Sequence, residues 1–70
     1  MTVKAPQAII DQAQEIIGNL PRKDWPEDES YDLGDGWDLY VYRDEKDRNS
    51  RCAKVIDRDN EPAKIWNNIQ

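Results

Sequence analysis

The chain has 70 residues, of which 36% are charged and 37% hydrophobic, and a length that supports one hydrophobic core predicts a single small domain over residues 1–70. Its 15 acidic and ten basic residues give a net charge of −5, which disfavours direct binding to nucleic acid or to an anionic membrane. The chain has no histidine and one cysteine, which excludes histidine-based acid–base catalysis, the usual zinc ligand sets and an intramolecular disulfide.

The first predicted element is an amphipathic helix over residues 6–17. Pro6 suits the first turn of a helix, where its missing N–H group is not needed, and Gly18 suits the left-handed position that ends one. Apolar residues recur there at a spacing of three and four, namely Ile9, Ile10, Ala13, Ile16, Ile17 and then Leu20. This stripe either packs on the protein's own sheet or docks with a partner.

After a linker bracketed by Pro21 and Pro26, the chain has the pattern of an antiparallel sheet. Aromatic and β-branched residues predict strands over 37–43, 52–57 and 62–66, with Asn60 at positive φ in the last turn. Residues 30–33, before Gly34, add a further short strand. The predicted fold is therefore α+β, with one N-terminal helix packed on a three- or four-stranded antiparallel meander.

The predicted core combines the helix isoleucines with one face of the strands. It contains Trp37, Leu39, Val41, Ala53, Val55 and Ile65. Cys52 is interpreted as a small buried hydrophobic residue. The opposite face of the sheet carries Tyr40, Tyr42 and Trp66, and it is either partly covered by the chain ends or available for docking.

The negative charge is concentrated in residues 24–38, which hold seven acidic residues and no basic residue. The acids and the two aromatic residues among them form the predicted partner-binding site: Asp24, Trp25, Glu27, Asp28, Glu29, Tyr31, Asp32, Asp35 and Asp38. Aromatic rings can stack on arginine side chains while carboxylates pair with them, so this segment suits a basic protein surface. A solvated loop that maintains solubility and a cation-binding site are the alternatives.

No motif indicates catalysis, a metal or a cofactor. Residues 32–38 lack the alternation of acids found in a helix-loop-helix calcium site, and in residues 57–61, which have it, Pro62 replaces the required glycine. A domain of this size is not expected to form a pocket of several hundred Å³. The sequence therefore predicts a protein that is not an enzyme and that has no metal or cofactor.

These features favour a small cytoplasmic binding protein or inhibitor that occupies a basic, nucleic-acid-binding site on a larger protein and mimics nucleic acid there. Small size and acidity are the general profile of anti-CRISPR and anti-restriction proteins of phages and mobile elements, although no motif supports a family assignment. The N-terminal residues lack the apolar run of a secretory signal, and no segment is long and apolar enough for a membrane span.

Two other functions stay open. The first is an accessory or structural subunit that docks through its helix stripe or aromatic sheet face, including docking with a second copy as a homodimer. The second is direct nucleic-acid contact through Arg43, Lys46, Arg48 and Arg51, whose charge the neighbouring acids nearly cancel.

Overall fold

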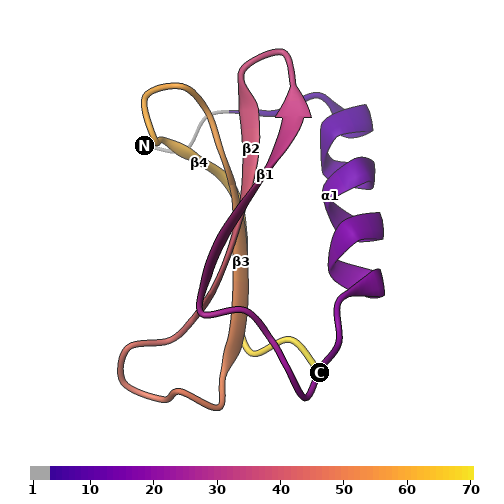
Figure 1. Ribbon diagram of the computed structural model, residues 1–70. Coiled ribbons are helices and arrows are strands. Elements are labelled where there is room, and N and C mark those ends of the chain that lie inside the picture. Colours follow the sequence, from indigo (N-terminus) through magenta and orange to yellow (C-terminus); the bar gives the residue numbers. More distant parts are fainter. Residues whose placement is uncertain (1–3) are drawn as a thin grey trace.

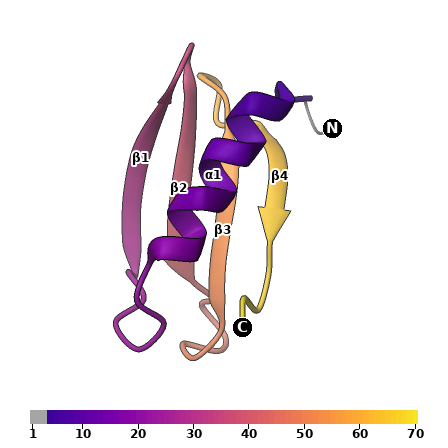
Figure 2. The ribbon, with the colours of Figure 1, turned by 90° about the vertical axis from the view of Figure 1, so that its right-hand side faces the viewer.

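The computed structural model describes residues 4–70, which form one helix and four strands arranged in two layers (Figure 1). The elements are α1 (Gln7–Asn19), β1 (Asp28–Gly34), β2 (Trp37–Arg43), β3 (Arg51–Ile56) and β4 (Pro62–Trp66). Neighbouring strands are antiparallel, and their order in the sheet, β1-β2-β3-β4, is their order in the chain. Helix α1 crosses one face of this sheet diagonally (Figure 2). The predicted α+β meander is confirmed, with four strands.

Helix α1 begins after Pro6, as predicted, but it ends two residues later than predicted. Gly18 lies inside the helix and does not adopt a positive φ. The helix ends because a residue before proline is disfavoured in the helical region, and Leu20, which precedes Pro21, is extended with φ −76° and ψ 141°. The side chain of Arg22 then donates hydrogen bonds to the carbonyl oxygens of Ile17 and Leu20, each at 2.9 Å. These bonds give the Ile17 carbonyl a second donor beside the amide of Leu20, and they satisfy the carbonyl group of the residue that follows the helix.

A tight turn joins β1 to β2. Asp35 and Gly36 have φ values of 54° and 83°, and positive φ at both central residues is the pattern of the type I′ turn that favours two-residue hairpins. The register shifts between Asp32 and Gly34, and Gly34 itself has a φ of 87°. β1 spans residues 28–34 and is longer than the short strand predicted over residues 30–33. Asn60 has the positive φ that was predicted for it, at 63°.

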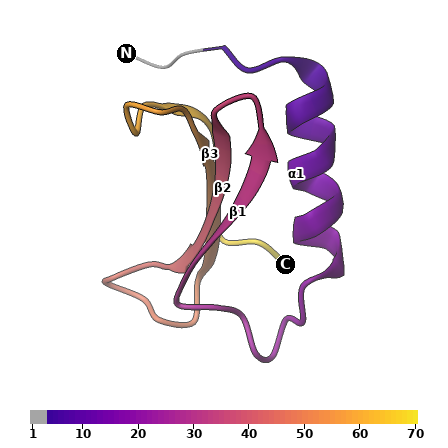
Figure 3. The same ribbon diagram turned by 45° about the horizontal axis from the view of Figure 1, so that its top comes forward.

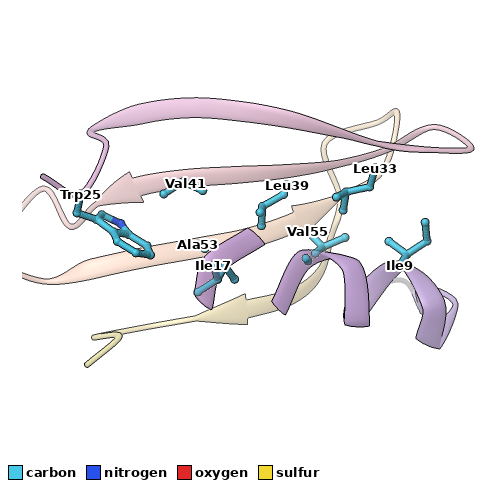
Figure 4. Packing of buried hydrophobic residues seen from close by; sticks show 9 residues of the cluster. Ile9, Ile17, Trp25, Leu33, Leu39, Val41, Ala53 and Val55 are labelled. Atoms are coloured by element: carbon cyan, nitrogen blue, oxygen red, sulfur yellow. The ribbon is translucent and has the colours of Figure 1, made fainter. Parts of the chain in front are cut away.

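The core lies between α1 and the sheet face that it covers, which we call the inner face. Its buried residues are Ile9, Ala13, Ile17, Trp25, Leu33, Leu39, Val41, Ala53 and Val55 (Figure 4). The predicted burial of Leu39, Val41, Ala53 and Val55 is confirmed, and Trp37 is half-buried against the same cluster. The helix stripe packs on the protein's own sheet and is not free to dock with a partner.

The prediction for β4 is wrong about which side chain enters the core. Ile65 is 46% exposed and lies opposite Lys54, whereas Trp66 lies opposite Ala53 and packs against the core. Successive side chains of a strand point to opposite faces, so an assignment that is wrong by one residue exchanges the two faces. Here β4 has one extra residue where the register shifts between Val55 and Ile56. From Lys64 onward, its side chains therefore point to the face opposite to the one that strict alternation from Pro62 would give.

Trp25, which was predicted to lie on the binding surface, is instead a core residue. Its side chain is 2% exposed, and its indole Nε1 donates hydrogen bonds to the carbonyl oxygens of Tyr42 and Cys52. A small core gains much from burying an indole ring, provided that the N–H group finds an acceptor. Cys52 is buried, as predicted.

Candidate protein-binding surface

The sheet face opposite α1, which we call the outer face, is covered by no second layer within residues 4–70 (Figure 3). Residues that alternate with those of the inner face direct their side chains to it. By strand register these are Asp28, Ser30, Asp32, Asp38, Tyr40, Tyr42, Cys52, Lys54, Ile56 and Ile65. Acidic side chains therefore lie on the β1 side of this face, and aromatic and aliphatic side chains lie beside them.

Two tyrosines and a lysine form the centre of the outer face. The ring centroids of Tyr40 and Tyr42 are 5.4 Å apart, and Nζ of Lys54 lies 5.4 Å and 5.5 Å from them. This distance is within the range of a cation–π interaction. Hydrogen bonding to the carboxylate of Asp28 raises the pKa of Tyr40, and burial raises the pKa of Tyr42. Both shifts favour the neutral form of the phenol, and Lys54 lies over both rings.

Strand β1 divides the predicted acidic site between the two faces of the sheet. Asp28 and Asp32 point to the outer face, and Glu29 points to the inner face at the sheet edge. Asp38 lies directly opposite Asp32 on β2, where two like charges repel each other. Asp35 lies in the turn that follows β1. The acids therefore lie on β1, at one side of the sheet in Figure 2, and on the turn and the strand that follow it, and they do not gather in one compact cluster.

Two further residues of the predicted site are already engaged. The hydroxyl of Tyr31, which is half-buried against the core, donates a hydrogen bond to Oε2 of Glu29 at 2.7 Å, and this bond raises the pKa of Tyr31. Glu27 forms an ion pair with Arg48 at 3.1 Å. Within residues 4–70 no ion pair involves the other six acids, which are Asp24, Asp28, Glu29, Asp32, Asp35 and Asp38. These six make up what we call the acidic edge.

Several arginines bind the protein's own backbone. Arg43 donates to the carbonyl oxygens of Trp25 at 3.0 Å and of Arg48 at 2.9 Å. Arg51 donates to the carbonyl oxygen of Arg22 at 2.7 Å. With Arg48 paired to Glu27, three of the four cations considered for direct nucleic-acid contact have partners inside the molecule. The arrangement therefore gives no support to that function.

Sequence reasoning missed Ser30, which accompanies the acidic edge on the outer face, and it assigned Tyr40 to that face without joining it to the acidic site. Ser30 lies directly opposite Tyr40, and both line a shallow hollow of about 340 Å³ with Asp28 and Asp38. The available signal was the alternation in residues 28–33, where the hydrophobic positions Tyr31 and Leu33 share one face. Read as a strand, that segment places Asp28, Ser30 and Asp32 together.

The surface of residues 4–70 has open hollows. One hollow, of about 580 Å³, lies beside Tyr40 and Tyr42 and is bordered by the loop after β2. The expectation that no hollow of several hundred Å³ would form is therefore wrong. Both acidic and basic side chains line this hollow, among them Asp44, Glu45, Lys46 and Arg48. Within residues 4–70 no three potential metal-ligating side chains come together.

Among residues 4–70, no helix is long and apolar enough to cross a lipid bilayer. Comparison of the chain with protein-family models, with curated proteins and with solved structures gives no match in any of the three. The function is therefore argued from the surface itself.

Proposed function

We propose that this protein is a small cytoplasmic binding protein or inhibitor that occupies a basic, nucleic-acid-binding surface of a larger protein. The observation that carries this proposal is the acidic edge, whose side chains are outside the core and have no ion pair within residues 4–70. A surface that holds phosphate groups presents arginine and lysine, and both pair with carboxylates as they do with phosphates. The carboxylates of Asp28 and Asp32 on one face of β1, with Asp38 beside them on β2, are complementary to such a surface.

The distribution of the positive charges also supports the proposal. Arg22, Arg43 and Arg51 donate hydrogen bonds to backbone carbonyl groups, and Arg48 pairs with Glu27. Residues 24–38 contribute seven acids and no base. These seven acids would steer a basic partner toward the acidic edge and make association dependent on salt.

The test compares two variants with the same change in net charge. The edge variant carries Asp28→Asn, Asp32→Asn, Asp35→Asn and Asp38→Asn. The control variant carries four amide substitutions elsewhere on the surface, at Glu15, Glu45, Asp59 and Glu61. A partner is first captured from a lysate with the unmodified protein, and its affinity for all three proteins is then measured between 50 and 500 mM salt, which is roughly a threefold change in Debye length.

We expect the edge variant to bind the partner at least about tenfold more weakly, with a shallower salt dependence, and the control variant to bind with little change. A nucleic acid that the partner binds should compete with the unmodified protein. Equal affinity of the two variants, or binding that nucleic acid does not disturb, would contradict the proposal. The edge variant should also unfold at the same temperature or slightly higher, since the repulsion between Asp32 and Asp38 is removed.

A second candidate function is docking through the outer face as an accessory subunit or a homodimer. The exposed Ile65, beside Lys54 and the two tyrosines, favours it. The helix stripe takes no part, because α1 packs on its own sheet. Sedimentation of the protein at rising concentration tests this function: a dimer that Ile65→Asp dissociates would favour it over the acidic edge.

A further inference from the structure

We propose that the free edge of β1 binds an extended, basic segment of the partner as a fifth strand of the sheet. This inference rests on the proposed function and specifies how the partner is held. β1 is an end strand of seven residues, and an end strand presents unpaired N–H and C=O groups. Strand addition is a common way in which such edges bind peptides.

The two edges of the sheet differ in how they are protected. The β4 edge carries Pro62, which has no N–H group, and Lys64, and both residue types discourage strand pairing. β1 contains neither proline nor lysine, and α1 crosses the face of the sheet without running along this edge (Figure 2). The β1 edge is therefore the edge that is open to a basic strand.

The direction of the β1 backbone groups follows from the hydrogen bonds across the sheet. The amide of Asp44 donates to the carbonyl oxygen of Ser50 at 3.2 Å, so the even-numbered residues of β2 direct their backbone groups toward β3. The indole of Trp25 agrees with this, because it reaches the carbonyl oxygens of both Tyr42 and Cys52, which lie opposite each other. The odd-numbered residues of β2 therefore face β1.

In β1, the same alternation decides which backbone N–H and C=O groups point away from β2. Glu29 and Tyr31 lie opposite Val41 and Leu39, so their backbone groups pair with β2. The backbone groups of Asp28, Ser30 and Asp32 consequently point away from the sheet. The same residues present their side chains on the outer face, two of them carboxylates. An added strand with basic residues four positions apart would make backbone hydrogen bonds and two charge pairs at once.

The charge of the edge also bears on pairing with a second copy of this chain. Antiparallel pairing of two β1 strands about Ser30 would set each Asp28 against the Asp32 of the other copy, and like charges directly opposite each other are destabilising. The charge of the edge thus favours a cationic strand and opposes edge-to-edge pairing in this register.

The first test uses a capped heptapeptide of alternating lysine and valine with the full, unmodified protein. We expect amide hydrogen exchange at Asp28, Ser30 and Asp32 to slow on addition of the peptide, with no change at Glu29 and Tyr31. A matched peptide with methylated lysine amide nitrogens keeps the charge and loses the backbone donors, so it should bind at least about tenfold more weakly. Equal binding of both peptides, or no protection of the three amides at millimolar peptide, would overturn strand addition.

The second test uses the captured partner and two substitutions at one position. Ser30→Pro removes an outward N–H group without removing a bond to β2, and Ser30→Thr keeps that group and serves as the control. Circular dichroism establishes that both variants fold. We expect Ser30→Pro alone to weaken binding, by about tenfold. If the edge variant weakens binding and a folded Ser30→Pro does not, strand addition is wrong and the proposed function stands; if neither weakens it, both are wrong.

Discussion

The indole nitrogen of Trp25 lies 3.1 Å from the carbonyl oxygen of Tyr42, so a residue of the linker after α1 is bonded to the end of β2. Arg22 places its guanidinium group 5.3 Å from the centroid of the indole ring, and Arg43 bonds to the Trp25 carbonyl oxygen. The ring thereby joins the helix, the linker and the sheet at one end of the core.

Trp25→Ala should therefore unfold much of the protein. Truncating a buried tryptophan costs about 3–5 kcal/mol, which is comparable to the few kcal/mol that a core of this size supplies. Trp25→Phe keeps most of the apolar surface and loses the indole donor, so about 1–2 kcal/mol is expected. Urea denaturation followed by circular dichroism measures both. A Trp25→Ala protein as stable as the original would return this residue to the surface.

Leu39→Ala and Ile65→Ala test which face of the sheet is buried. Leu39 is fully buried and should lose about 2–5 kcal/mol on truncation. Ile65 is 46% exposed on the outer face, and its truncation should change the free energy of unfolding by less than about 1 kcal/mol. The two melting temperatures give the comparison directly. Similar losses in both variants would mean that Ile65 belongs to the core after all.

Arg22→Lys should loosen the end of α1 while leaving the charge unchanged. Arg22 donates to the carbonyl oxygens of Ile17, Leu20 and Gln70, and a lysine ammonium cannot reproduce that set of donors. We expect a loss of about 1–2 kcal/mol. Amide exchange should become faster in the last turn of α1 and at the C-terminal end of the chain. Faster exchange spread evenly over the sheet would contradict this role.

The stability of the protein should fall in alkaline solution because all three tyrosines have raised pKa values. Hydrogen bonding raises the pKa of Tyr31 and Tyr40, and burial raises that of Tyr42, above the ordinary value of 10.0. A group whose pKa is higher in the folded state contributes stability below its unfolded pKa and loses that contribution as pH rises through the folded value. The free energy of unfolding should therefore decrease above about pH 10.

Absorbance titration of the phenols checks this expectation. Glu29→Gln removes the carboxylate that accepts the Tyr31 hydroxyl, so the pKa of Tyr31 should move back toward 10.0, while those of Tyr40 and Tyr42 stay raised. Titration of all three phenols at or below 10.0 in the unmodified protein would contradict the structure.

The strands after residue 36 were predictable because their patterns are strong and local. Trp37–Arg43 is rich in aromatic and β-branched residues, and it was found at the predicted limits. β1 was only partly predicted, because acidic residues have low strand propensity and its length comes from pairing with β2. The end of α1 was misjudged because Pro21 acts through the residue before it, so that Gly18 is not needed as a terminator.

The candidate site was harder to predict than the fold. The charge of residues 24–38 was evident, but nothing local distinguishes an indole that stacks on a partner from one that fills a core, and Trp25 does the latter. The positions of the acids depend on the period of β1, which separates Glu29 from its neighbours Asp28 and Ser30. The backbone groups of the edge depend on the register of β2 with β3, which is set by pairing far along the chain.

Because each strand pairs with the strand next to it in the chain, the sheet can assemble by closing one short hairpin after another. Such hairpins form in about 1–10 μs, and chains dominated by local contacts fold quickly. Helix α1 has no such neighbour, since it packs across β1 and β3, whose residues are far apart in the sequence. We therefore expect docking of α1 to complete folding, so the helix, which precedes every strand in the chain, reaches its final packing last.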